Sequence, residues 1–153
     1  MKVTNSKAKH NYELGERWEC GIVLTGAEAK SAKLGQVDMG GSYCKLNHPS
    51  TALRASKFQT ELWVQNLKIF AYKHADNEKY DPMRKRKLLL HQREILAIAG
   101  KMKQMSRLLI PTAIYTKSDV VKIEVALARG KRMYEKREEI KKRDFNREME
   151  REG

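Results

Sequence analysis

Hydrophobic and polar residues alternate in two stretches of this chain, which is the pattern of strands with one buried face. Residues 18–24 have Trp, Cys, Ile and Leu at every second position, and Glu19 lies on the opposite side. Residues 119–128 alternate in the same way. A strand is also predicted over residues 108–116, and the three residues 117–119 that follow it are short enough for a hairpin.

Two segments carry the signals of helices. Thr25 is followed three residues later by Glu28, which makes a capping box, and Gly35 suits the position just after a helix end. Asp81-Pro82 has the form of an N-cap followed by proline at the first helical position. We therefore expect one helix after Thr25 and a second from Asp81 to about Met102.

The other central segments are predicted as weaker strands and loops. Residues 37–46 form a strand that the pair Gly40-Gly41 bends, and residues 61–72 form one strand or a strand pair. Residues 47–60 are predicted as a loop or insertion, and residues 76–80 as a polar loop. About five short antiparallel strands with two helices are typical of a small OB-like β-barrel, mostly β with flanking helices. An α+β sandwich is the alternative.

Charged segments flank this body at both ends. Residues 1–11 are polar and basic and are predicted as a loosely ordered N-terminal arm. Residues 130–153, called the tail below, contain nine Lys or Arg and seven Asp or Glu, and their few apolar residues do not form one continuous face. Such a helix is marginal alone and folds against a partner. We expect a body over residues 12–129 and a tail that is disordered when free and helical when bound.

The net charge narrows the class of partner. With 153 residues and a formal charge of +13, the chain favours a polyanion, because neutralising phosphates releases counterions. No run approaches the roughly 20 apolar residues of a spanning helix, and the N-terminus lacks a secretory signal. Cys20 and Cys44 are predicted as free thiols. These features predict a cytoplasmic protein with a nucleic acid as its leading partner.

Signals of catalysis are weak. The sequence has no glycine-rich phosphate loop, no CxxC, no HExxH and no GxSxG. Its four histidines are widely separated and have no carboxylate or cysteine at ligand spacing. We therefore predict that the protein is not an enzyme and has no metal or cofactor.

Several residues are candidates for contact with RNA. The run Arg84–Lys87 lies at the start of the second predicted helix, where the macrodipole disfavours cations, so phosphate contact explains it better than a solvated face. Glu19 either pairs with a basic side chain or accepts hydrogen bonds from an RNA base or 2′-hydroxyl. The aromatic residues Trp18, Tyr43 and Trp63 are predicted to lie in the core, because they stand in apolar alternation. Tyr134 has no core to enter and favours stacking or docking.

Four motifs in order resemble the SsrA-binding protein family (small protein B, SmpB) over nearly the whole chain. These are residues 5–12 (NSKAKHNY), 21–31 (GIVLTGAEAKS), 81–91 (DPMRKRKLLLH) and 128–138 (ARGKRMYEKRE). The chain departs from the family pattern at Ala29, Ser106 and Glu135, in the length of residues 47–60 and in its acidic end.

The resemblance implies an RNA-binding protein of trans-translation. Such proteins hold the transfer-RNA-like domain of transfer-messenger RNA (tmRNA, or SsrA) on an OB-like body and deliver it to ribosomes stalled without a stop codon. The tail becomes helical in the empty messenger channel of the small subunit. The resemblance also implies the elongation factor that carries aminoacyl-tmRNA as a partner, and a monomer when free.

Particular residues match the family motifs. Asn5, Glu19 and Leu89 match positions implicated in RNA binding, and their setting adds the basic contacts Lys7, Lys9, His10, Arg84, Arg86 and Lys87. The ribosome-binding tail motif matches Gly130, Lys131, Arg132, Tyr134, Lys136 and Arg137. Two rival classes remain open. A generic RNA-binding OB module or ribosomal protein explains the charge and the barrel but not the ordered motifs, and a nuclease would need clustered carboxylates for metal ions.

Overall fold

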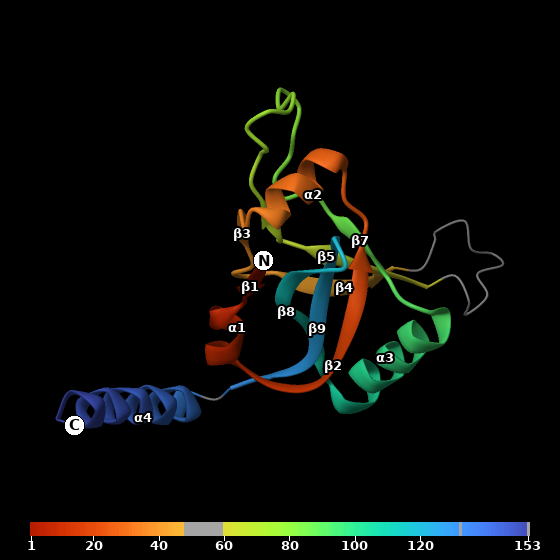
Figure 1. The fold of residues 1–153 in the computed structure, drawn as a ribbon. Helices are drawn as coiled ribbons and strands as arrows, with labels where there is room; N and C mark the ends of the chain where they lie inside the picture. Colours follow the sequence, from red (N-terminus) through yellow and green to blue (C-terminus); the bar gives the residue numbers. More distant parts are fainter. Residues whose placement is uncertain (48–59, 132, 153) are drawn as a thin grey trace.

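A computed structural model describes residues 1–47, 60–131 and 133–152. Its main sheet has seven antiparallel strands in the order β1-β8-β9-β2-β7-β5-β4, and β3 and β6 form a small second sheet (Figure 1). The strands of the main sheet are β1 (Lys2–Thr4), β2 (Tyr12–Ile22), β4 (Tyr43–Asn47), β5 (Glu61–Gln65), β7 (Arg86–Leu89), β8 (Leu108–Lys117) and β9 (Val120–Gly130). The second sheet is β3 (Val37–Asp38) with β6 (Lys68–Ile69). The helices are α1 (Ser6–Asn11), α2 (Gly26–Lys33), α3 (Gln92–Met105) and α4 (Met133–Glu152).

The predicted fold class is confirmed: the body is mostly antiparallel sheet with flanking helices. The main sheet ends at β1 on one side and at β4 on the other, so the barrel is not closed by hydrogen bonds within the described residues, although the arrangement is compatible with an OB-like fold. One apolar core fills the curved sheet, and Leu62, Ile114 and Ile123 are fully buried in it. Helix α3 adds Ile95 and Ile98 to this core.

Both cysteines lie in this core as free thiols. Burial raises the pKa of Cys20 to about 12 and raises that of Cys44 well above its usual value. Both thiols are therefore protonated at neutral pH, and they act as small apolar core residues.

Three local predictions are confirmed. Most of the strand predicted over residues 18–24 is the second half of β2, which ends at Ile22, with Cys20 buried and Glu19 exposed. Thr25 and Glu28 form the predicted capping box at the start of α2. The turn between β8 and β9 has positive φ at Ser118 and Asp119, which are 49° and 62°. Positive φ at both central residues is the geometry that suits a two-residue hairpin.

The helix predicted from Asp81 to Met102 is wrong in its first half, because α3 begins only at Gln92. Asp81 instead caps a turn, where its carboxylate accepts a hydrogen bond from the Met83 amide at 2.9 Å. Residues 86–89 then form strand β7. Asp-Pro suits a turn as well as a helix start, and the alternation of buried and exposed residues along 86–89 decides for the strand.

The N-terminal segment is ordered, in contrast to the loose arm predicted for residues 1–11. Strand β1 pairs with β8 at the edge of the sheet, with Val3 opposite Ile114. Helix α1 follows, and its Ala8 is buried against the body. Backbone hydrogen bonds tie this segment to the body at both ends of β1, where the Asn5 amide donates to the Thr112 carbonyl at 2.8 Å.

The strand predicted over residues 37–46 is divided into β3 and β4 at Gly40-Gly41, where the bend was predicted. Gly41 has a φ of 79°, which favours glycine. Segment 61–72 contains two strands, β5 and β6, as the second alternative expected, but they lie in different sheets and do not pair with each other. The predicted loop at 47–60 lies almost entirely outside the described residues.

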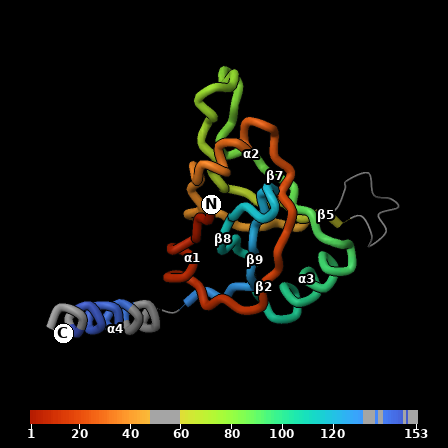
Figure 2. The backbone as a smooth tube through the Cα atoms, viewed as in Figure 1, coloured from red at the N-terminus to blue at the C-terminus, as the bar shows by residue number. Residues whose placement is uncertain are grey.

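Helix α4 projects from the body beside α1, as the ribbon and the tube both show (Figures 1 and 2). It contacts α1 where Arg143 Nη2 lies 3.1 Å from His10 Nδ1. Its residues Phe145 and Met149 are 61% and 58% exposed, so packing on the body does not bury its apolar side chains. Among the described residues, no helix is long and apolar enough to cross a membrane.

Candidate nucleic-acid interface

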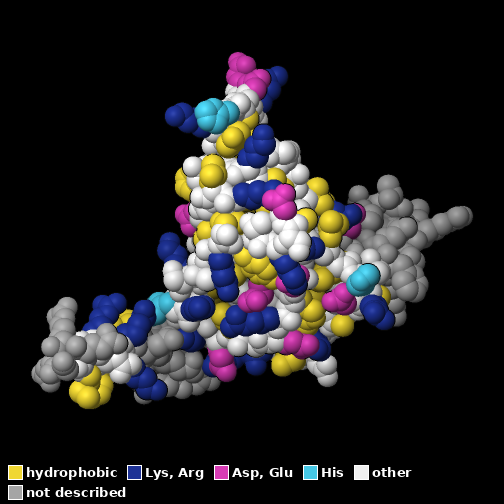
Figure 3. Space-filling view, viewed as in Figure 1, with side chains coloured by type: hydrophobic (Ala, Val, Ile, Leu, Met, Phe, Trp, Pro, Cys, Tyr) yellow, Lys and Arg dark blue, Asp and Glu magenta, His cyan; other side chains and the backbone are white. Residues whose placement is uncertain are grey.

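The strand register aligns residues of five strands, the candidate Leu89 among them, in one row on the solvent side of the sheet. Lys2 pairs with Tyr115, Tyr115 with Lys122, Lys122 with Gly21 and Gly21 with Leu89. Because directly opposed residues point to the same side of a sheet, these five form a continuous surface. We call this side of the sheet the outer face. Figure 3 shows Lys and Arg side chains over β2, β8 and β9, with acidic side chains among them.

Glu19 lies on the outer face two residues before Gly21. Its carboxylate accepts hydrogen bonds from the Tyr115 hydroxyl at 2.5 Å and from Lys117 Nζ at 3.3 Å. The Tyr115 hydrogen bond is the main cause that lowers the pKa of Glu19, and Glu19 in turn contributes to the raised pKa of Tyr115. The Glu19 side chain remains 38% exposed, so the anionic carboxylate has oxygen lone pairs available to an RNA donor.

Leu89 is an apolar residue of the outer face and is 51% exposed. A Cβ added at Gly21 would lie 3.2 Å from the Leu89 Cβ, which is a tight contact. The absence of a side chain at Gly21 therefore leaves room for the Leu89 side chain beside β2, opposite a position two residues along the strand from Glu19. The pairing of β2 with β7 therefore places the predicted RNA contacts Glu19 and Leu89, far apart in the sequence, on the same part of the outer face.

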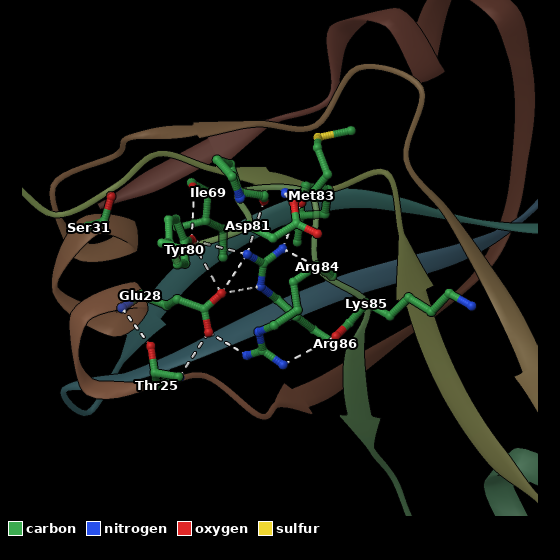
Figure 4. Close-up of polar contacts among 12 residues, drawn as sticks. Thr25, Glu28, Ser31, Ile69, Tyr80, Asp81, Met83, Arg84, Lys85 and Arg86 are labelled. Atoms are coloured by element: carbon green, nitrogen blue, oxygen red, sulfur yellow. Dashed lines mark hydrogen bonds and ion pairs between the residues drawn. The ribbon is translucent and has the colours of Figure 1, made fainter. Parts of the chain in front are cut away.

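The basic run of residues 84–87 is split by the alternation of β7. Arg84 and Arg86 point toward α2, whereas Lys85 points away from them (Figure 4). Lys87 lies on the outer face, where it pairs with Trp63 across the strands and its Nζ lies 3.5 Å from Glu61 Oε1. Because β7 is a strand, these cations do not sit at a helix N-terminus, and the dipole argument for phosphate contact does not apply to them.

Arg86 is fully buried, and so is Glu28, its partner on α2. The Arg86 Nε donates to Glu28 Oε2 at 2.7 Å, and its Nη1 donates to the Leu67 carbonyl at 2.7 Å. The Tyr80 hydroxyl and the Arg84 guanidinium complete this network (Figure 4). Burial alone would raise the pKa of Glu28, but hydrogen bonds from Arg84, Thr25 and Arg86 hold it down at about 2. Arg86 therefore has no free donor face on the surface.

Asn5 is also buried, with 4% of its surface exposed. Its Nδ2 donates to the Pro111 carbonyl at 2.8 Å and to the Met39 carbonyl at 3.3 Å, and its Oδ1 accepts from the Ala8 amide as the N-cap of α1. Every hydrogen-bonding group of this side chain has a protein partner. The geometry assigns Asn5 to holding α1 on the body.

The other basic candidates at the N-terminus lie on α1. Lys7 and Lys9 are exposed, and His10 is partly exposed beside Arg143. Lys7 also lines a groove of about 500 Å³ between α1, the Gly40-Gly41 turn and β8. These cations are separated from Glu19 by β8 and β9, so the candidates occupy more than one part of the surface.

The prediction that Tyr43 and Trp63 lie in the core is wrong. Tyr43 is 38% exposed, and Trp63 alternates with the buried Leu62 and Val64, so both lie on the outer face and outside the core. The lysines at 45, 117 and 122 and at position 2 were also missed as members of this face. The sequence does carry a signal for them: because alternate residues of a strand point to opposite faces, the lysines lie on the face opposite the apolar residues of the same strand.

The tail candidates begin where the sheet ends. Gly130 is the last residue of β9, opposite Tyr12, and the Lys131 amide donates to the Asn11 carbonyl at 2.9 Å. Arg132 lies outside the described residues, and the backbone of Tyr134 and Lys136 is in α4 although their side chains are not described. Arg137 is exposed on α4.

A basic, open antiparallel sheet of this kind, with an ordered outer face of lysines, aromatic rings and carboxylates, defines a small RNA-binding protein of OB-like fold. The family model described as "SmpB protein" matches residues 2–153. By this match, the chain belongs to the SmpB family.

Individual relatives agree with the family match. The chain is 44% identical over 150 residues to the SsrA-binding protein of Dehalococcoides mccartyi, covering 98% of this chain and 81% of the relative. It is 45% identical over 147 residues to the SsrA-binding protein of Persephonella marina, covering 96% of this chain and 90% of the relative. A chain of the solved structure "tmRNA-SmpB: a journey to the center of the bacterial ribosome" is similar with a TM-score of 0.66 and 36% identity, covering 86% of this chain and 85% of that one.

Proposed function

We propose that this protein binds the transfer-RNA-like domain of tmRNA through the outer face of its sheet and delivers tmRNA to ribosomes stalled without a stop codon. The observation that carries the proposal is the family match over residues 2–153, which includes the tail as well as the body. The names of the relatives, SsrA-binding proteins, and the solved tmRNA-SmpB structure support the RNA and the ribosome as partners.

The outer face suits an RNA elbow chemically. Its lysines neutralise phosphates and supply affinity without regard to sequence. The Glu19 carboxylate accepts hydrogen bonds from a base or a 2′-hydroxyl, and the exposed Leu89 packs against a base or a ribose beside it. In this proposal Asn5 and Arg86 are positioning residues, because their polar groups are used inside the protein.

The tail has a separate role in the proposal. Its cations meet ribosomal RNA in the empty messenger channel of the small subunit, where the helix gains the partner that it lacks in solution. The elongation factor that carries aminoacyl-tmRNA is the further partner of the delivered complex. The role is one of binding, without a catalytic step by the protein, and it places the protein in the cytoplasm with the ribosomes.

The direct test replaces Glu19 by alanine and measures the dissociation constant for the transfer-RNA-like domain by fluorescence anisotropy. We expect the affinity to fall about 10-fold or more, since a hydrogen bond to a charged group contributes roughly 1.5–3 kcal/mol. The matched control is Glu16→Ala, which removes another exposed carboxylate from β2. Unchanged affinity with Glu19→Ala would return Glu19 to a purely structural role.

A competition assay separates the proposal from generic RNA binding. Unlabelled hairpin RNA without an elbow should displace the transfer-RNA-like domain only at a much higher concentration. Equal competition would favour a non-specific RNA-binding module instead.

A further inference from the structure

The segment between β6 and the turn before β7 leaves the body as a protrusion. It covers residues 70–80 and stands above α2, clear of the sheet, in all three whole-molecule views (Figures 1, 2 and 3). None of the candidate residues discussed above lies in it. Most residues of this protrusion are exposed to solvent.

Aromatic rings occupy every second position at the start of the protrusion. Phe70 is 43% exposed, Tyr72 is partly exposed and His74 is exposed. The rings of Tyr72 and His74 meet edge to face, with centroids 5.5 Å apart. Phe70 keeps 43% of its surface exposed beside two further rings, and such a cluster of exposed rings points to a partner.

Lysines are interleaved with these rings. Lys68 Nζ lies 4.8 Å from the centroid of the Phe70 ring, and Lys30 Nζ, on α2, lies 5.5 Å from that of Tyr72. Lys73 is exposed between Tyr72 and His74. We call the six residues Lys30, Lys68, Phe70, Tyr72, Lys73 and His74 the aromatic–lysine ladder. Cations beside aromatic faces are the combination with which proteins hold unpaired nucleotides, because the rings stack on bases and the ammonium groups meet phosphates.

The acidic residues of the protrusion lie at its tip. The Asp76 carboxylate accepts a hydrogen bond from the Glu78 amide at 3.2 Å and so shapes the turn. Figure 3 shows acidic side chains at the outermost end and Lys, His and hydrophobic side chains below them. The charge of the ladder itself is therefore positive, which suits a phosphate backbone.

The base of the protrusion is held rigidly. The Ser31 hydroxyl donates to the Phe70 carbonyl at 2.6 Å, and the Phe70 amide donates to the Gln36 carbonyl at 3.0 Å. The Tyr80 hydroxyl donates to the Ile69 carbonyl at 2.8 Å and joins the buried network of Glu28 and Arg86 (Figure 4). Higher up, Asn77 Nδ2 donates to the Tyr72 carbonyl at 2.8 Å. These bonds fix the backbone that carries the rings, so little ordering is left for a partner to impose.

We propose that the aromatic–lysine ladder is a second contact with tmRNA, at which unpaired bases stack on Phe70 and on the Tyr72–His74 pair while the lysines neutralise the neighbouring phosphates. This inference rests on the proposed function, since it assigns a further part of the same RNA to a surface separate from the outer face. RNA is favoured over a protein partner because the exposed rings alternate with cations, whereas the cores of protein interfaces are depleted of charged residues.

The test compares two double variants of the full chain. Phe70→Leu/Tyr72→Leu keeps apolar surface but removes the aromatic faces, and Phe70→Tyr/Tyr72→Phe keeps both rings. Neither side chain makes a hydrogen bond of the anchoring network, so circular dichroism should show both variants folded. The dissociation constant for full-length tmRNA should rise at least about 5-fold with the leucine variant and stay within about 2-fold with the aromatic one. The loss should persist at high salt, because stacking is not screened as phosphate contacts are.

A spectroscopic measurement reads the contact directly. The indole introduced by Tyr72→Trp should change its fluorescence when tmRNA is added, over and above the change seen in the parent protein. Wild-type affinity of the leucine variant would overturn the inference, whatever its activity in translation, and would leave a protein partner as the explanation of the rings. If Glu19→Ala still weakens binding in that case, the proposed function stands; if the parent protein does not bind tmRNA at all, the proposed function itself fails.

Discussion

Arg86 and Lys87 are neighbours in the chain and have opposite surroundings. Arg86 has no exposed surface and is saturated by Glu28, Tyr80 and backbone carbonyls, whereas the Lys87 side chain is 40% exposed on the outer face. In the sequence both residues belong to one basic run. Their difference arises from strand parity and from a carboxylate 58 residues away. Individual roles within the run are therefore a property of the fold.

The buried pair makes a testable claim about stability. Glu28→Gln should destabilise the fold by about 3–5 kcal/mol, because it leaves the Arg86 charge buried without its partner. Urea denaturation followed by circular dichroism measures this, and Glu61→Gln, at a partly exposed pair, is the matched control with an expected cost below about 1 kcal/mol. Equal effects of the two changes would contradict the assigned importance of the network.

The same pair predicts acid sensitivity. The pKa of Glu28 is lowered in the folded state to about 2 from 4.5, so its contribution is present above about pH 4.5 and is lost as the pH falls toward 2. The wild-type protein should lose stability across this window more steeply than Glu28→Gln. Parallel pH profiles would show that Glu28 is not the group responsible.

At the scale of elements, local signals located most strands but failed at two places. The alternation of β2 and β9, the capping box of α2 and the β8–β9 hairpin are visible in the sequence because each depends on neighbouring residues. The Asp81-Pro82 signal was ambiguous between a turn and a helix, and the charge of residues 84–87 obscured a strand pattern. The order of residues 1–11 depends on pairing with β8, more than 100 residues away, which no local window contains.

Asn5 is the residue that holds this N-terminal element. Asn5→Ala should destabilise the protein by about 2–3 kcal/mol, since it removes the cap of α1 and leaves the Met39 and Pro111 carbonyls without their donor. Hydrogen exchange should accelerate at the amides of residue 5 and Thr116, which pair β1 with the body. The control is Asn11→Ala at the other end of α1. Exchange that is unchanged at residue 5 and Thr116 would refute the anchoring role.

For the molecule as a whole, the net charge predicts the chemical class of the partner, but it does not predict where on the surface the partner binds. The net charge of +13 indicates a polyanion, but the position of the interface follows from the register that aligns Lys2, Lys122 and Leu89. Family motifs identified most of the candidate residues, yet only the fold separates Glu19 and Leu89, which are exposed, from Asn5 and Arg86, which are buried.

Salt dependence tests the electrostatic share of this binding. The outer face presents six lysines, namely Lys2, Lys45, Lys85, Lys87, Lys117 and Lys122. If they meet phosphates, a plot of log affinity against log salt concentration should have a slope of about −4 to −5. Lys87→Ala should make the slope shallower by about 1, whereas Lys103→Ala on α3 should leave it unchanged. A slope near zero would contradict phosphate-dominated binding.

The central claim is that the body binds tmRNA and the tail acts on the ribosome. The most direct measurement compares residues 1–131 with the full chain, both for tmRNA affinity and for tagging of stalled chains in a reconstituted translation system. The cut follows Lys131 because Gly130 is still paired in the sheet and the Lys131 amide bonds to Asn11. The account predicts that the shortened protein binds tmRNA within about 2-fold of the full chain and supports no tagging. Loss of tmRNA binding would show that the tail belongs to the RNA-binding surface, and normal tagging would show that the ribosome does not need it.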